Sequence, residues 1–195
     1  PPSWQDVVTE LGGRPLHAPW LRGLKPTQSG GFDLDAAVSE LLTRLDLDDL
    51  EQVDLCGVQL GAMVALRMAA QAPAKVGRVV VVDTPVVPTA TTQRVQLALM
   101  RLMPQRAFTE AGVTKQMAIE AMKAMAGLDL SHDLGQIGAP VLVVASEGDR
   151  AAMAGAQLLV QRLVDARTVH LPGSNPLREQ AASLAQAIAS FLDET

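Results

Sequence analysis

The sequence predicts an α/β fold with a doubly wound, mostly parallel sheet, because buried-strand patterns and amphipathic-helix patterns alternate along it. Two continuous apolar runs, Val79 to Val82 and Val141 to Val144, lack the polar alternation of a half-exposed strand. Such runs are typical of parallel strands that are buried on both faces. Because a chain of 195 residues is long enough for one well-buried core, we expect a single domain over residues 1–195.

Local patterns place the individual elements. The helix expected over Asp33–Leu45 opens with acidic residues, which suit a helix N-terminus, and carries a leucine-rich stripe. The segment Ala62–Gln71 is rich in strong helix formers, and Met153–Val164 and Leu177–Leu192 are amphipathic at the helical period. The expected strands are Arg14–Pro19, Gln52–Cys56, Arg78–Asp83, Val141–Ser146 and Arg167–Leu171.

Composition excludes several classes of function. The formal net charge of -5 and the absence of a basic stripe argue against a nucleic acid partner and against binding to an anionic membrane surface. No apolar stretch is long enough to span a membrane, and the first residues do not form a signal peptide. The single cysteine, Cys56, excludes an internal disulfide and makes a zinc site implausible, so we expect a cytoplasmic protein without metal or cofactor.

The residues Gly57-Val58-Gln59-Leu60-Gly61, which we call the elbow, form the most informative motif. They match the glycine-x-serine-x-glycine turn between a parallel strand and a helix, except that Gln59 replaces the serine. The flanks fit this setting, because an apolar strand precedes the elbow and a helix-forming segment follows it. We expect both glycines to be required, since a side chain at either position would clash with the strained backbone.

The segment Leu55 to Leu66 around the elbow resembles the same region of the α/β-hydrolase superfamily. The segment Arg78 to Pro85 resembles the next strand of that family, and Ser3 to Leu11 resembles an early helix of it. The resemblance implies an α/β-hydrolase-like fold and fixes where a catalytic triad would stand.

At the triad positions only one residue type is kept. A serine hydrolase needs a nucleophilic oxygen, a histidine base and a carboxylate that orients the histidine. Gln59 stands at the nucleophile position, where its amide either binds a ligand from the floor of a pocket or is satisfied by neighbouring backbone. Asp149 stands at the acid position, although we favour a role in capping the helix that begins near Ala151. Asn175 is nearest to the histidine position and cannot act as a base near neutral pH.

Other reactive residue types do not replace the missing groups. His17, His132 and His170 are expected to be ordinary surface or satisfied histidines. Cys56 is expected to be a buried structural thiol at the end of its strand. Asp83 follows a predicted strand, and an isolated carboxylate there is weak evidence for a site.

The N-terminal region departs most from the resembling family. Pro15 to Gly23 resembles a strand and loop that usually end in Asp-Leu-Arg-Gly, with Trp20 in place of the aspartate. The family's earlier strands and its His-Gly loop, which supplies one oxyanion donor, have no counterpart, so the resemblance implies an N-terminally truncated sheet. The strands Arg14–Pro19 and Gln52–Cys56 would then pair directly, or a partner chain, a swapped element or a missing piece of the natural protein would fill the gap. An incomplete sheet thus favours a protein partner or a homo-oligomer.

Residues 89–127 interrupt the alternation with Met- and Ala-rich helical segments, where the resembling family inserts a helical cap over the site. Methionines there could line an adaptable apolar pocket, although at helical spacing they more often pack the cap itself. The candidate ligand-binding residues are Gln59, Leu60, Trp20, Met100, Met103 and Met122.

The loss of triad residues decides the expected function. Because removing a triad serine or histidine lowers turnover by on the order of 10^6, serine-hydrolase chemistry is not expected. The primary expectation is a pseudoenzyme that binds a small apolar molecule or a protein partner. Two alternatives remain: an enzyme without acyl transfer that uses Asp149 for cyclisation, isomerisation or proton transfer, and a weak hydrolase completed by a further segment or partner chain.

Overall fold

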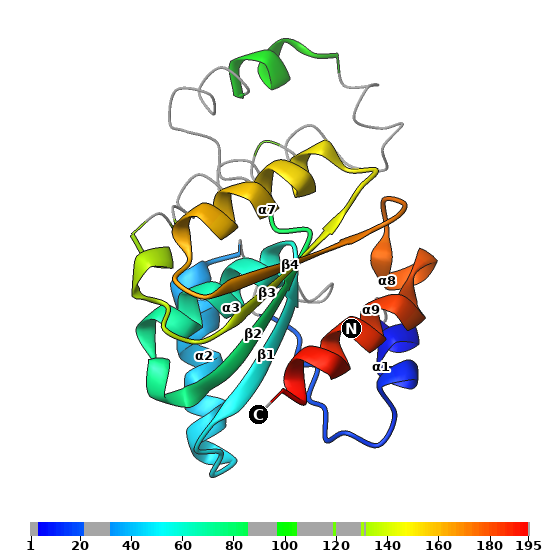
Figure 1. Cartoon of the computed structure of the whole chain (residues 1–195). Helices are drawn as coiled ribbons and strands as arrows, with labels where there is room; N and C mark the ends of the chain where they lie inside the picture. The colour runs from blue at the N-terminus through cyan, green and yellow to red at the C-terminus, as the bar shows by residue number, and fades with distance from the viewer. Residues whose placement is uncertain are drawn as a thin grey trace.

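The computed structural model describes residues 4–21, 32–85, 97–104, 119, 130 and 132–194. The strands β1 (Val53–Val58), β2 (Val76–Val82), β3 (Val141–Ser146) and β4 (Ala166–Leu171) form a 4-stranded sheet in the order β1-β2-β3-β4. All of its pairings are parallel. Helices cover both faces (Figure 1), which confirms the expected doubly wound α/β architecture.

The helices fall into two layers. One face of the sheet carries α2 (Leu34–Leu47), α3 (Leu60–Gln71) and α7 (Arg150–Arg162), and the other carries α1 (Gln5–Leu11), α8 (Pro176–Glu179) and α9 (Ala181–Leu192) (Figure 1). Two short 3-10 turns, Pro73–Lys75 and Leu134–Gln136, precede β2 and β3. The expected helix Leu177–Leu192 is thus divided in two, and the helix expected from Met153 begins earlier, at Arg150.

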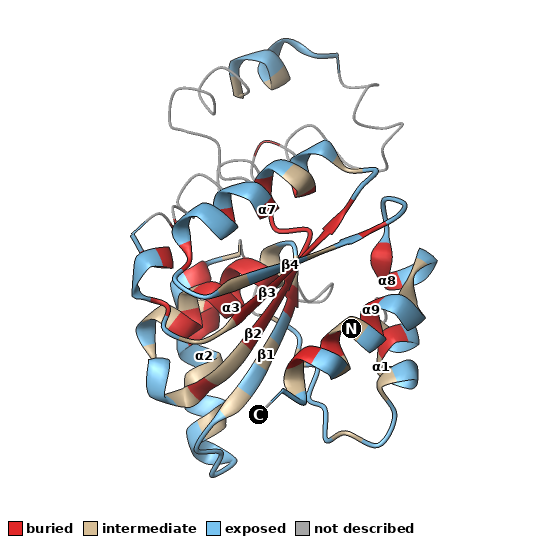
Figure 2. Ribbon diagram, viewed as in Figure 1, coloured by how far each residue is buried: buried red, intermediate tan, exposed pale blue. Residues whose placement is uncertain are grey.

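The inner strands are buried because they have a helical layer on each face. Val79 and Val81 pack with α2, α3 and α7, whereas Val80 and Val82 pack with α1 and α9. Every residue of β3 is buried, and Figure 2 shows burial fading toward β1. The unbroken apolar runs of the sequence therefore correspond to strands covered on both faces.

The expected strand over Arg14–Pro19 is wrong. These residues form no strand in the structure, and no hydrogen bond joins them to a described strand. The physical reason lies in Pro15 and Pro19, which have no N–H to donate to a ladder. The segment instead runs from Arg14, which pairs with Asp193 beyond α9, to Trp20, which lies against α2. The outer edge of β1 is consequently left without a described partner strand.

Part of the expected cap at 89–127 is described. Residues 97–102 are helical, with Leu99 and Leu102 exposed, Met100 half-buried and Met103 exposed. Ile119 is buried, while Met122 and most of the remaining cap lie outside the described residues. The cap and the single-domain boundary therefore stay predictions. Within the described ranges, no helix has the length and apolarity that crossing a membrane would require.

Candidate functional site

The elbow is a sharp turn held entirely by backbone groups. β1 ends at Val58 and α3 begins at Leu60, so Gln59 alone connects them, with φ 48° and ψ -112°. The Gln59 N–H donates to the Val82 carbonyl at 2.9 Å, and the Gln59 carbonyl accepts from the Ala62 N–H at 3.0 Å. A positive φ is strained for a residue with a side chain. The predicted strand, turn and helix are confirmed, with the strained residue at the serine-equivalent position.

The elbow's two glycines differ in what they do. A Cβ at Gly57 would overlap the Gly61 carbonyl group and lie 2.5 Å from the Ala62 nitrogen, so the strand and the helix can approach only without a side chain there. At Gly61, by contrast, an added Cβ meets no described atom within 4 Å. The expectation that both glycines are sterically required is correct for Gly57 and wrong for Gly61. The close approach is between the α-carbon of Gly57 and the carbonyl group of Gly61, so a side chain on Gly61 itself would not clash with a described atom.

Free hydrogen-bonding groups gather at this turn. The Gln59 side chain is exposed and has no hydrogen-bond partner among the described residues. Leu60, which packs partly against the core, and Gly61 occupy the first positions of α3, where N–H groups have no acceptor within the helix. The side-chain amide of Gln59 is therefore not hydrogen-bonded to neighbouring described backbone, which leaves it available for a ligand.

Asp149 caps α7, as we favoured from the sequence. Its Oδ1 accepts from the Ala151 N–H at 2.8 Å and from the Ala152 N–H at 3.3 Å, and its backbone is extended as an N-cap requires. These bonds hold the carboxylate at the helix terminus. Asp149 is thus engaged structurally at the acid-equivalent position.

The histidine-equivalent loop lies beside the Asp149 loop. The Gly148 N–H donates to the Gly173 carbonyl at 2.8 Å, so the loops that follow β3 and β4 are in contact. Asn175 is exposed as the N-cap of α8, and its side chain makes no capping bond. The Glu179 carboxylate instead accepts from the Ser174 N–H at 3.0 Å. Gln59, Asp149 and Asn175 all follow parallel strands and so share one edge of the sheet, where α/β proteins bind ligands.

No histidine stands at this edge among the described loops. His170 lies within β4 opposite Ala145, and His17 is exposed in the segment between α1 and α2. His132 faces Gln136, with 3.0 Å between the ring Nδ1 and the amide nitrogen. The described residues therefore place no histidine base next to Gln59.

A buried Asp83–Ser146 pair was missed by the sequence reasoning. Asp83 is 7% exposed, and its φ of 46° makes it a second strained residue at the carboxyl edge. Its carboxylate accepts from the Ser146 N–H at 2.7 Å and from the Ser146 hydroxyl at 2.8 Å. These bonds tie the end of β2 to the end of β3. Asp83 is therefore not a stray carboxylate but a structural link beneath the site, which a residue pattern along the chain does not reveal.

Cys56 differs from its expected environment. The residue is exposed, because β1 lies at the edge of the sheet and not in its middle. Desolvation by the atoms around the side chain nevertheless raises the pKa of the thiol to about 12. With a pKa of about 12 the thiol is protonated at neutral pH, so Cys56 does not supply a nucleophile.

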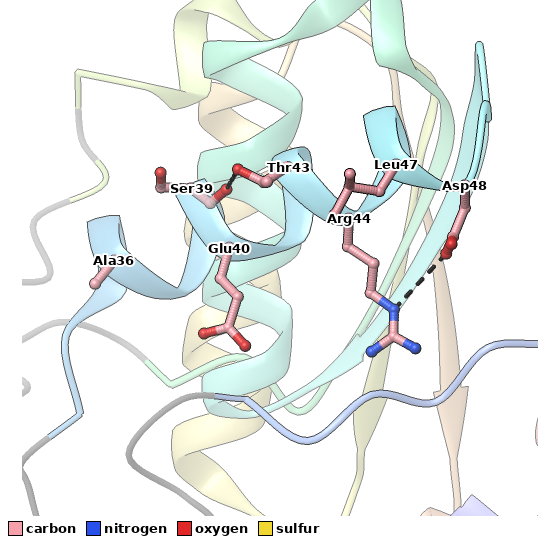
Figure 3. A pocket seen from close by; sticks show the side chains of 7 residues that line it. All are labelled: Ala36, Ser39, Glu40, Thr43, Arg44, Leu47 and Asp48. Atoms are coloured by element: carbon pink, nitrogen blue, oxygen red, sulfur yellow. Dashed lines mark hydrogen bonds and ion pairs between the residues drawn. The ribbon is translucent and has the colours of Figure 1, made fainter.

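Two hollows lie along α2 and away from the triad-equivalent residues. The larger, about 700 Å³, is an open surface along one side of the helix (Figure 3), and its lining residues are Ala36, Ser39, Glu40, Thr43, Arg44, Leu47 and Asp48. The smaller, about 20 Å³, places Trp20 beside Leu41. Trp20, a candidate ligand-binding residue, lines the smaller hollow, whereas Gln59 lines neither of them. Among the described side chains no cluster could hold a metal ion.

No protein-family model matches the chain. Among solved structures, it is similar to a thermophilic esterase from Thermogutta terrifontis, with 21% sequence identity and a TM-score of 0.73 over 97% of this chain and 84% of that chain. It is also similar to a meta-cleavage product hydrolase, with 15% identity and a TM-score of 0.72 over 100% of this chain and 86% of that one. An enol-lactonase from Burkholderia xenovorans LB400 matches with 19% identity and a TM-score of 0.68, covering 86% and 76% of the two chains. At such identities the likeness concerns the fold.

Proposed function

We propose that this chain, which has the α/β-hydrolase fold, is a non-catalytic protein that binds a small, largely apolar ligand at the elbow. The observation that carries the proposal is the Gln59 side chain, which stands on a strained backbone with an amide that has no partner among the described residues. The amide both donates and accepts hydrogen bonds, so it suits a carbonyl, hydroxyl or amide group on the ligand.

The strain supports a retained role for the Gln59 side chain. A non-glycine residue in a sparsely populated φ/ψ region costs about 1–3 kcal/mol, and glycine at the same position would remove most of that cost. A turn kept for folding alone would therefore be more stable with glycine. A ligand that contacts the amide gives a reason for keeping the side chain there.

The remaining groups favour binding over hydrolysis. The amide of Gln59 is not a nucleophile, and Asn175 is not a base. The Asp149 carboxylate is bound to two N–H groups of α7, which also disfavours its use as a proton-transfer group. The hydrolase names of the structural neighbours describe those proteins, and the residues at the elbow argue against that chemistry here.

Restoring a serine alone is expected not to restore hydrolysis. The Gln59→Ser variant should hydrolyse p-nitrophenyl acetate within about twofold of the wild-type rate. A serine without its histidine base turns over on the order of 10^6 times more slowly than one in an intact triad. Initial rates of the two purified proteins, measured side by side, check this expectation. A Gln59→Ser variant that turns over the ester far faster than wild type would show that a base stands near the turn.

Replacing Gln59 by glycine is expected to stabilise the protein while removing ligand binding. Relief of the strained φ should outweigh the greater entropy that glycine gives the unfolded chain. The free energy of unfolding should rise by about 1 kcal/mol, and Tm by about 3 °C. Asp49, with φ 52° after the end of α2, offers a control, since Asp49→Gly also replaces a residue of positive φ by glycine, away from the site. Thermal unfolding should show both variants stabilised, and only Gln59→Gly should lose the ligand.

Native mass spectrometry of the protein purified from its native source tests the binding proposal directly. We expect a retained small molecule on the wild type, and up to about fivefold lower occupancy on Gln59→Ala, since losing one buried hydrogen bond of about 1 kcal/mol raises the Kd about fivefold. Asn175→Ala, which changes an exposed side chain without a described bond, should keep the occupancy. A wild-type protein with no retained mass, or a Gln59→Ala variant with full occupancy, would contradict the proposal.

A further inference from the structure

A buried carboxylate without a counter-charge lies next to the elbow. Asp83 is 7% exposed, and both of its carboxylate oxygens accept a hydrogen bond from Ser146, which is the pattern of an ionised group. Among the described residues no lysine, arginine or histidine forms an ion pair with Asp83. Two neutral donors offset only part of the free energy lost when a charge is buried, so a cation close to Asp83 would be stabilised.

The residue that follows Asp83 carries an unused hydroxyl group. Thr84 is 6% exposed, and its Oγ1 has no hydrogen-bond partner among the described residues. Two other buried side-chain atoms there lack hydrogen bonds, Nε of Arg67 and Oδ2 of Asp133, but these two residues form an ion pair at 3.0 Å. A buried hydroxyl without a partner is unfavourable, so the Thr84 hydroxyl suits a polar group that the described residues do not supply.

Both buried groups stand beside the Gln59 amide at the carboxyl end of the sheet. Val58 lies opposite Val82 in the β1–β2 ladder, and the Gln59 N–H donates to the Val82 carbonyl. Gln59 is thus the neighbour of Asp83 across the ladder, where adjacent strands lie about 5 Å apart. The Gln59 side chain is exposed and has no hydrogen-bond partner among the described residues. Three neighbouring residues therefore offer oxygen acceptors at one place, and one of these acceptors carries a full negative charge.

We propose that the ligand at the elbow carries a primary ammonium group that donates to the Gln59 amide oxygen and the Thr84 hydroxyl and offsets the charge of Asp83. This inference rests on the proposed function and names the polar end of its ligand. An ammonium group has three donors and no acceptor, so it matches three oxygen acceptors. The Asp83 carboxylate keeps lone pairs beyond the two that Ser146 uses.

The same groups disfavour other polar ends. A carboxylate on the ligand would be repelled by Asp83, and the repulsion is strong where protein atoms exclude water. An alcohol donates one hydrogen bond and leaves the charge of Asp83 uncompensated. A quaternary ammonium keeps the positive charge but has no N–H, and its bulk does not suit groups that are only 7% and 6% exposed at Asp83 and Thr84.

Four ligands with one apolar body test the polar end. Hexylamine, hexanol, hexanoate and hexyltrimethylammonium are titrated into the wild-type protein near neutral pH by isothermal titration calorimetry. Hexylamine should bind at least about tenfold more tightly than each of the others, because hydrogen bonds to charged groups are stronger than those between neutral groups. Hexanoate should bind most weakly. Hexanol, hexanoate or hexyltrimethylammonium binding as tightly as hexylamine, or binding of none of the four, would overturn the proposal.

Two substitutions in one hydrogen-bonded pair isolate the charge of Asp83. Asp83→Asn removes the charge and keeps an acceptor for the Ser146 N–H, whereas Ser146→Ala removes one hydrogen bond of the pair and keeps the charge. The preference for hexylamine over hexanol should fall to about twofold or less in Asp83→Asn and stay near about tenfold in Ser146→Ala. Equal loss of the preference in both variants would show that the pair acts only as a structural link.

The Thr84 hydroxyl is tested by two substitutions of similar size. Thr84→Val removes the hydroxyl, and Thr84→Ser keeps it. Thr84→Val should bind hexylamine about fivefold more weakly than Thr84→Ser does. Its Tm should not fall, because the described structure gives this hydroxyl no hydrogen bond to lose. A Thr84→Val variant with a lowered Tm and unchanged hexylamine affinity would assign the hydroxyl a structural role and overturn the contact.

Gln59→Ala separates this inference from the proposed function on which it rests. We expect the variant to bind hexylamine about fivefold more weakly than wild type does. If hexylamine and hexanol bind the wild type equally and both weaken in Gln59→Ala, the ammonium is wrong and the elbow remains a ligand site. If Gln59→Ala changes neither affinity, the contact with Gln59 and the proposed function both fail.

Discussion

Gly57→Ala is expected to prevent stable folding. A Cβ at this position overlaps the carbonyl group of Gly61 and lies 2.5 Å from the Ala62 nitrogen, so the end of β1 and the start of α3 must separate. Both elements pack into the main core cluster, and backbone atoms cannot move aside as a flexible side chain does. We expect a destabilisation of about 4 kcal/mol or more, a large part of the stability of a typical domain.

The second glycine provides the matched control. Gly61→Ala adds the same methyl group in the same turn, but no described atom lies within 4 Å of it, and alanine is the better helix former. Its stability should equal that of the wild type or exceed it by up to about 1 kcal/mol. Urea unfolding monitored by circular dichroism compares the three proteins. Similar losses in both variants would show that the close approach between Gly57 and the Gly61 carbonyl is not what holds the turn.

Asp83→Ala is expected to destabilise the protein by about 3 kcal/mol, or about 10 °C in Tm. The substitution removes the acceptor of two hydrogen bonds and leaves the Ser146 N–H and hydroxyl buried without partners. Ser146 is fully buried, so water cannot replace the lost carboxylate without a rearrangement of the strand ends. Differential scanning calorimetry measures this change.

Two smaller substitutions divide the effect of Asp83. Asp83→Asn keeps an acceptor for the Ser146 N–H, and Ser146→Ala removes only the hydroxyl bond. Each should cost about 1 kcal/mol, clearly less than Asp83→Ala. If Asp83→Ala were no more destabilising than either of them, the pair would not be the link between β2 and β3 that its geometry indicates.

The sequence was most informative where local chemistry alone determines the structure. The apolar runs identified β2 and β3 because only a strand covered on both faces lacks polar alternation. The elbow was found from its glycine spacing, and the capping role of Asp149 followed from its place before a helix. In each case the deciding interactions lie within a few residues along the chain.

The sequence was least informative where distant segments meet. Pairing between Asp83 and Ser146 joins residues far apart in the chain, and the exposure of Cys56 depends on what lies beside β1. The segment Arg14–Pro19 was interpreted from family resemblance, although its two prolines are poor ladder residues. Steric need at Gly61 could not be separated from that at Gly57 by spacing alone, because the difference depends on which atoms meet.

The central claim is that the elbow keeps its strained geometry without acyl-transfer chemistry. Intact mass spectrometry after incubation with a fluorophosphonate probe tests it most directly, because the probe reports any activated serine irrespective of the natural substrate. We expect no adduct on the wild-type protein and none on Gln59→Ser, since Asn175 and the capped Asp149 provide no base. One adduct per wild-type chain, abolished by prior denaturation, would contradict the account.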